Sequence, residues 1–363
     1  MGQIYNNKFI LDQIGGAIEK SHFHHTNLYH SANGGYGLPL AVHTAKLLTC
    51  EQESACGKCR NCTRVEKLEH PDVIWSFPTV SGGSTGTCDD YFQEFKSALL
   101  ANPYLDMESW QETIATKNQQ LLFGVKEISN IHKKLSLTSA EGGNRVLIIW
   151  LPEIIAAAAS NKLLKLIEEP LKNTYILLVS HKPAKLLPTV RSRCAPWKLN
   201  PPILEDVRAL FPEHGEEDVQ RFFLLHPNNI GRVLHNLNEG GENLDLFAHW
   251  MRIAYKGVLG EMVEETNTLS ALPKEQLKSI ITLAIRMLQS GFLVNATGEK
   301  SPYSGNLGAI DIGKLSKSVT PVGAMKISEY LHDLLRDLSR NIHTKTAVLN
   351  TTIQLNNAFR GRI

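Results

Sequence analysis

Two apolar runs joined by a helical segment constrain the fold of this chain more than any other feature. Arg145–Trp150 (RVLIIW) and Thr174–Ser180 (TYILLVS) are short and largely apolar, as strands covered on both faces are. Between them, Ile154–Glu169 has apolar residues at helical spacing and stops at Pro170. A strand, a helix and a strand in this order form a parallel unit with a right-handed crossover. We therefore expect an α/β fold built on a parallel sheet.

At 363 residues, the chain is longer than a single domain usually is, and its length suits two or three domains. Strand signals run from Asn27 to Ser180 and stop after Asn200-Pro201-Pro202, beyond which the pattern is helical. We predict an α/β domain over residues 1–200, a small helical domain over 201–240 and a larger helical domain over 241–363.

Residues 75–123 interrupt the α/β pattern, and we interpret them as an insertion. Ser81–Thr87 (SGGSTGT) has the composition of a flexible surface loop, which would lead into one or two short helices. We interpret Cys88, which follows this loop, as an ordinary reduced thiol.

The charge balance excludes several classes of protein. Lys and Arg number 38 against 36 Asp and Glu, and 42% of residues are apolar, which indicates neither disorder nor a strongly basic nucleic-acid binder. Residues 1–16 lack the basic and apolar regions of a targeting signal, and no run approaches the roughly 18 apolar residues of a membrane helix. We expect a cytoplasmic protein with no membrane partner.

A glycine-rich turn follows the first expected strand, Leu28–Ser31, and precedes the expected helix Leu40–Leu48. Its glycines are Gly34, Gly35 and Gly37. A nucleotide-binding loop belongs between a strand and a helix, where backbone N–H groups can cradle phosphates. A plain tight turn is the alternative interpretation.

The residues after these glycines lack phosphate chemistry. A working loop needs an ammonium group for the phosphates and a hydroxyl for Mg²⁺, but Leu38 and Pro39 occupy those places. The strand that should supply metal-binding acids ends in Trp150-Leu151-Pro152, and Glu153 is the nearest carboxylate. We predict a degenerate loop that binds no ATP and hydrolyses none.

Four cysteines are spaced as metal ligands: Cys50, Cys56, Cys59 and Cys62. Tetrahedral Zn²⁺ suits four thiolates, and a complete four-sulfur shell leaves no open position, so the zinc would be structural. Reduced cysteines without metal and an iron–sulfur cluster are the alternatives. Haem attachment is excluded because Thr63 stands where histidine is required.

Two arginines, Arg191 and Arg193, lie at the end of the α/β part. Exposed arginines are usually only solvated. A guanidinium can instead reach the phosphate site of a neighbouring subunit and neutralise charge in the transition state. The residues alone leave both interpretations open.

Several segments together resemble the delta-prime subunits of bacterial clamp loaders, within the AAA+ family. In chain order they are the glycine turn with its cysteines, His70-Pro71-Asp72, Ala159–Pro170 (ASNKLLKLIEEP) and Ser192-Arg193-Cys194. The similarity covers about residues 25–240 and is most specific from 145 to 200. The gap of five residues between Cys50 and Cys56 is shorter than the usual gap in that family.

The resemblance implies a function. Arg193 would be an arginine finger acting in trans on ATP held by a neighbouring subunit, 201–240 a helical lid and 241–363 a collar. The implied partners are the tau or gamma motor subunits, the delta subunit, the sliding clamp and primer-template DNA. His181 stands where motor subunits keep a polar sensor, and we interpret it as a surface or strand-end residue.

Two other functions compete with this interpretation. One is an active AAA+ motor subunit, against which Leu38 and Pro39 argue. The other is a zinc-dependent nucleic-acid-binding module, for which Cys50–Cys62 lacks the basic runs and interleaved aromatics.

Overall fold

The computed structural model describes residues 2–80, 86–115, 119–239, 242–274, 276–278, 280–282, 284–285, 288, 306–307, 310–311, 320–340 and 342–361. The chain divides into two compact units, Met1–Glu216 with His226–His235 and Glu217–Leu225 with Asn236–Ile363. The three-domain division at residues 200 and 240 stays a prediction. Most of the expected flexible loop, residues 81–85, and the expected joint at Gly240-Gly241 lie outside the described residues.

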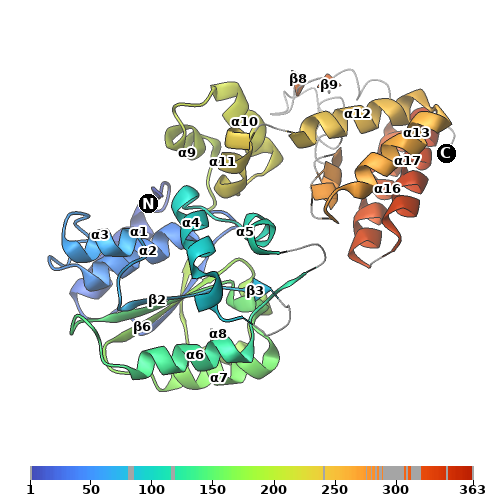
Figure 1. The fold of residues 1–363 in the computed structure, drawn as a ribbon. Helices are drawn as coiled ribbons and strands as arrows, with labels where there is room; N and C mark the ends of the chain where they lie inside the picture. The colour runs from blue at the N-terminus through green and yellow to red at the C-terminus, as the bar shows by residue number, and fades with distance from the viewer. Residues whose placement is uncertain are drawn as a thin grey trace. The chain divides into compact units, whose positions relative to one another are not determined.

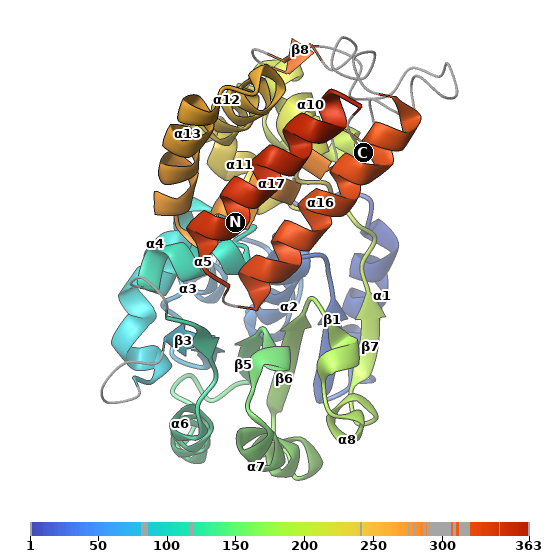
Figure 2. The ribbon, with the colours of Figure 1, turned by 90° about the vertical axis from the view of Figure 1, so that its right-hand side faces the viewer.

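A five-stranded parallel sheet forms the centre of the first unit (Figures 1 and 2). In spatial order its strands are β2 (Val73–Ser76), β5 (Arg145–Trp150), β6 (Thr174–Ser180), β1 (Thr26–His30) and β7 (Ala195–Lys198). The expected strands at 145–150 and 174–180 are confirmed residue for residue, as is the parallel α/β fold class.

Helices cover both faces of this sheet, which is why β5 and β6 are apolar at nearly every position. On one face Leu147, Ile149 and Leu178 pack in a core with residues of α6 (Val125–Ser136) and α7 (Ala157–Glu168). The other face of β5 and β6 contacts α2 (Gly37–Thr49). Because successive side chains of a strand point to opposite faces, each central strand contributes to both cores.

The first unit also contains helices before, between and after the strands. They are α1 (Lys8–Glu19), α3 (Arg60–Glu66), α8 (Pro188–Arg191), α9 (Leu204–Leu210), the part of α11 (Ile230–Glu239) up to His235, and the 3₁₀ turns Pro152–Ile154 and Pro183–Lys185. All of α10 (Glu216–Leu225) except Glu216 belongs to the second unit. The crossover helix α7 begins at Ala157, later than the expected Ile154, because Pro152 starts a separate 3₁₀ turn.

The insertion at 75–123 is a packed structure. It contains the antiparallel pair β3 (Thr79–Val80) and β4 (Leu121–Leu122), the 3₁₀ turn Cys88–Tyr91, and the helices α4 (Phe92–Ala101) and α5 (Met107–Ile114), which confirms the expected short helices. The rings of Phe77 and Phe95 are stacked at 3.9 Å, and Trp110 meets both rings edge-on. Trp110 also donates its indole N–H to Pro78 O over 2.8 Å. The insertion therefore holds α5 in a fixed position.

The second unit is mostly helical in its described part. Its helices include α12 (Glu242–Lys256), α13 (Leu259–Ala271), α16 (Pro321–Ser339) and α17 (Thr344–Phe359). The expectation that strands cease after residue 202 is wrong at one point, because β8 (Asn306–Leu307) pairs with β9 (Ile310–Asp311). A pair of two-residue strands is too short to produce a periodic pattern. Among the described helices, none has the length and hydropathy to cross a membrane.

Candidate functional site

The glycine turn lies between β1 and α2, as expected, and its backbone depends on glycine. Gly34 has a φ of 65°, in the left-handed region where a side chain is strained. A Cβ on Gly37 would lie 2.7 Å from a methyl group of Val179 on β6. The N–H of Gly37 donates to Ser31 Oγ over 3.0 Å and closes the turn. The loop has the form of a phosphate cradle.

The first turn of α2 offers no cation to this cradle. Leu38 and Pro39 are both buried, and Leu38 is only 3% exposed. Leucine cannot neutralise phosphate charge, and proline carries neither a hydroxyl nor a backbone N–H.

Protein groups from two distant segments contact the loop. The carboxamide of Asn33 accepts from Met107 N over 3.0 Å and donates to the carboxylate of Glu108, both on α5. From the start of α11, Gly231 N donates to Gly34 O over 3.0 Å. A Cβ added to Gly34 would lie 1.8 Å from Asn229 Oδ1, so the Asn229 side chain fills the space beside this glycine.

Carboxylates dominate the electrostatics beside the loop. Asp106 is fully buried and caps α5 by accepting from Ser109 N over 2.7 Å. Burial and the neighbouring charge of Asp106 raise the pKa of Glu108 to about 7, against the opposing hydrogen bond from Asn33. A polyphosphate placed here would meet the carboxyl groups of Asp106 and Glu108. Its negative charge would disfavour the ionised form of Glu108 still further.

The nearest carboxylate to the end of β5 has a structural role. Leu151 has a φ of 57° and turns the chain into Pro152–Ile154. This places Glu153 Oε1 where it accepts from His181 N over 2.9 Å and from Lys182 N over 3.1 Å. Glu153 thus ties the end of β5 to the end of β6.

His181 follows the last residue of β6, which confirms its interpretation as a strand-end residue. It is half-buried, and its ring meets Trp150 edge-on with centroids 6.3 Å apart. Burial, together with the charges of Lys182 and His30, lowers the pKa of His181 to about 3. The imidazole is therefore neutral at physiological pH.

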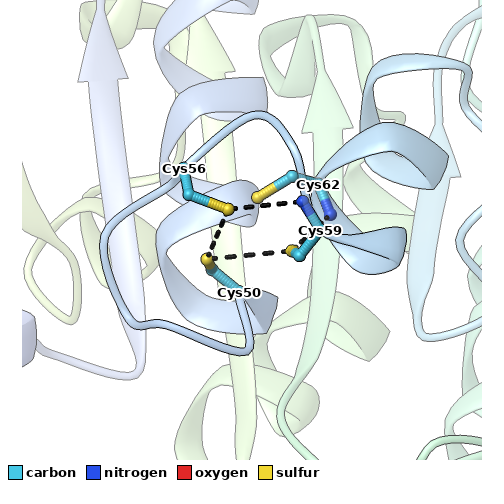
Figure 3. A group of neighbouring side chains, drawn as sticks. All are labelled: Cys50, Cys56, Cys59 and Cys62. Atoms are coloured by element: carbon cyan, nitrogen blue, oxygen red, sulfur yellow. Dashed lines mark hydrogen bonds between the residues drawn. The ribbon is translucent and has the colours of Figure 1, made fainter.

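The four spaced cysteines converge on one point (Figure 3). All four sulfurs lie within 4.8 Å of one another, with Cys50 Sγ 3.7 Å from Cys56 Sγ and 3.9 Å from Cys59 Sγ. Four sulfurs bound at about 2.3 Å to one tetrahedral ion lie about 3.8 Å apart. The cluster, which includes Cys50 despite its short spacing from Cys56, can hold a metal ion.

Helix ends position these cysteines. Cys50 is the C-cap of α2, and Cys59 is the N-cap of α3. Cys62 lies in the first turn of α3. Backbone N–H groups donate to three of the sulfurs at 3.4 Å: Gln52 N to Cys50, Cys59 N to Cys56 and Cys62 N to Cys59. Burial raises the pKa of Cys50, but backbone N–H bonds outweigh it and lower this pKa to about 6. Such donors stabilise thiolates, the form that binds metal.

Arg193 lies just beyond α8 with a partly exposed guanidinium. Its Nη2 is 2.8 Å from Glu168 Oε1 at the end of α7, and its Nη1 donates to Thr189 O over 2.9 Å. The Arg193 side chain keeps 42% of its surface exposed. Arg191, in the same segment, is also exposed.

Cys88 and two histidines near β1 have local roles. Cys88 is buried and donates its S–H to Phe77 O over 3.0 Å, and burial raises its pKa well above the usual range, as an unreactive thiol requires. His24 and His25 bond to backbone carbonyls of Thr26 and Ile167. The cysteine cluster is the one group of potential metal ligands found among the described residues.

The sequence matches a known family over the part that forms the sheet and the candidate sites. A family model described as DNA polymerase III, delta subunit, matches residues 6–202, more than half of the chain. The chain belongs to this family. The matched range contains the glycine turn, the four cysteines and Arg193, so all three candidate sites lie within the residues that match the family.

Individual relatives carry the delta-prime name. DNA polymerase III subunit delta' of Yersinia pestis is 32% identical over 192 residues, covering 52% of this chain and 45% of that protein. The Bacillus subtilis subunit delta' is 28% identical over 230 residues, covering 62% and 57%. The chain spans about half the length of the curated relatives it matches.

Among solved structures, the chain aligns with a DNA polymerase III gamma subunit-related protein of Thermotoga maritima. Its identity is 14%, its TM-score is 0.46, and the alignment covers 96% of this chain and 99% of that chain.

The sequence interpretation of this delta-prime family member missed the groups that contact the loop from outside. Glu108, Asn229 and Asp106 lie directly against the loop, and the Glu112–Arg232 pair joins α5 to α11 beside it. Glu108 and Glu112 are spaced to share a helix face, but no local pattern connects them to residues 120 positions later.

Proposed function

We propose that this chain serves as a nucleotide-free subunit of a clamp loader, which helps to open a sliding clamp and place it on primer-template DNA. The observation that carries the proposal is a phosphate-type loop that presents Leu38 and Pro39 in a chain of the DNA polymerase III delta-prime family. Such a subunit contributes shape and contacts to the ring while its neighbours consume ATP.

The partners in this proposal are the tau or gamma motor subunits, the delta subunit, the clamp and DNA within the assembled ring. Family membership supports the partnership. The near-neutral charge, 38 basic against 36 acidic residues, suits a protein that meets other subunits and shares DNA contacts across the ring.

Arg193 acts in this proposal as an arginine finger on a neighbouring subunit. The guanidinium is tethered by Glu168 and Thr189 O yet remains 42% exposed, so it can exchange one carboxylate for a phosphate without unfolding its segment. A half-exposed ion pair contributes at most about 1 kcal/mol, which a phosphate contact can offset.

Zinc is the metal that the cysteine cluster would hold. Four sulfurs at the spacing of a tetrahedral shell, with N–H donors to three of them, fit a structural Zn²⁺ ion better than an open catalytic site. The ion would fix the loop between α2 and α3.

Mixing the purified chain with motor and delta subunits of the same cell tests the proposed partnership. We expect a single complex by size-exclusion chromatography with light scattering, because the proposed role places the chain in one ring with these subunits. The motor subunits alone and the chain alone serve as controls. Elution of the chain apart from the other subunits, at concentrations well above those of the assay, would contradict the proposal.

A further inference from the structure

The insertion brings a set of polar groups against the phosphate loop and against the start of α11. We call this set the α5 clamp; its members are Asn33, Asp106, Glu108, Glu112, Asn229 and Arg232. Within it, α5 bonds to the loop through Asn33, which contacts both Met107 N and Glu108. The clamp also reaches α11, because Arg232 is only 7% exposed and pairs with Glu112.

The contact between α5 and α11 has strong geometry. Arg232 donates from Nη1 to Glu112 Oε2 over 3.1 Å and from Nη2 to Glu112 Oε1 over 2.9 Å, a two-pronged pair. Its Nη1 also lies 3.3 Å from Ser109 Oγ. Burial alone would lower the pKa of Arg232, but Glu112, Asp106 and Glu108 together raise it. These acidic neighbours therefore stabilise the charged form of the buried guanidinium.

Backbone contacts extend the same connection. Asn102 Nδ2 donates to Gly231 O over 2.9 Å, and Gly231 N donates to Gly34 O over 3.0 Å. A Cβ on Gly231 would lie 1.9 Å from Tyr104 O, so only glycine permits the insertion to approach this closely. Asn229 accepts from Arg232 N over 2.8 Å and thereby caps α11 beside Gly34.

We infer that the insertion acts as a built-in substitute for a nucleotide, occupying the space beside the loop and fastening the first turn of α11 to the sheet domain. A bound nucleotide would have to displace the Asn229 side chain and approach the carboxyl groups of Asp106 and Glu108. The clamp thus gives the 75–123 insertion a role: it keeps loop and α11 in one arrangement without ATP. This inference builds on the nucleotide-free part of the proposed function.

Hydrogen exchange of the full chain tests the clamp through Glu112→Gln, which keeps the side-chain shape and removes the charge paired with Arg232. Arg232 is buried although the Glu112 side chain is 41% exposed, so Glu112→Gln leaves a buried guanidinium without its paired carboxylate, and we expect amides in 31–37, 107–114 and 229–235 to exchange at least about 10-fold faster. Amides of β5 and β6 should keep their wild-type rates. Glu94→Gln, the same change at an exposed position of α4, is the matched control and should change none of these rates.

Unchanged exchange at 229–235 in Glu112→Gln would overturn the clamp. Faster exchange in all peptides, including β5 and β6, would also overturn it, because that result assigns Glu112 to global stability. Arg232→Met, measured in the same way, should loosen the same three segments if the pair acts as one unit. Neither variant requires motor subunits, so failure of this inference is separable from failure of co-assembly.

Discussion

Replacing Arg193 by alanine in the assembled loader is expected to slow ATP hydrolysis at the site of the adjacent motor subunit by on the order of 10³-fold or more. The reason is the loss of the one cation that this chain would supply to charge developing on the transferred phosphoryl group. The measurement is single-turnover phosphate release, in which the amplitude counts the sites that still react. The burst amplitude should decrease by the fraction that one ATP site contributes.

The control for this change is Arg191→Ala, which removes an exposed arginine from the same segment. It should leave the burst unchanged. Arg193 makes one half-exposed ion pair, with Glu168, so its loss should cost less than about 1 kcal/mol of stability and leave assembly intact. A full burst with Arg193→Ala in an intact complex would remove the finger assignment.

Removing one cysteine of the cluster is expected to release the metal and destabilise the first unit by more than about 4 kcal/mol, as losses of structural metals do. We choose Cys62→Ser, because Cys62 is buried at the start of α3 and its sulfur lies within 4.8 Å of the other three. Elemental analysis should find one zinc per wild-type chain and none in the variant. Chelation of the wild type should lower its melting temperature similarly.

Cys88→Ser is the matched control, since this buried cysteine lies outside the cluster. It should retain one zinc per chain whatever its stability. Wild-type protein purified without metal and unaffected by added zinc would show that the cluster consists of reduced thiols. Iron in place of zinc, with visible absorption, would favour the iron–sulfur alternative.

The parallel sheet was predictable because burial on both faces leaves a sequence mark. The strands 145–150 and 174–180 are apolar at nearly every position, and the helix between them ends at a proline. The edge strand β7 was missed because its residues are only intermediate or exposed and include Pro196. The β8–β9 pair was missed because it is only two residues long in each strand.

The candidate sites were predictable where their residues are close in sequence. The metal-ligand spacing is visible in the sequence because the four cysteines lie within thirteen positions. The missing phosphate-binding cation is visible because Leu38 directly follows the glycine turn. The α5 clamp was not predictable, because it joins Asn33, Glu112 and Arg232 from three distant segments. Each of these residues alone resembles an ordinary surface residue, and only the tertiary fold makes Arg232 a buried partner.

The interpretation as a passive ring member is tested most directly by titrating the isolated chain with MgATP in a calorimeter, with turnover followed in parallel. Because Leu38 and Pro39 replace the phosphate-binding cation and the metal-binding hydroxyl, and Asn229 fills the space beside Gly34, we predict no binding up to millimolar nucleotide and no hydrolysis. Micromolar binding, or turnover at the rate of a motor subunit, would contradict it.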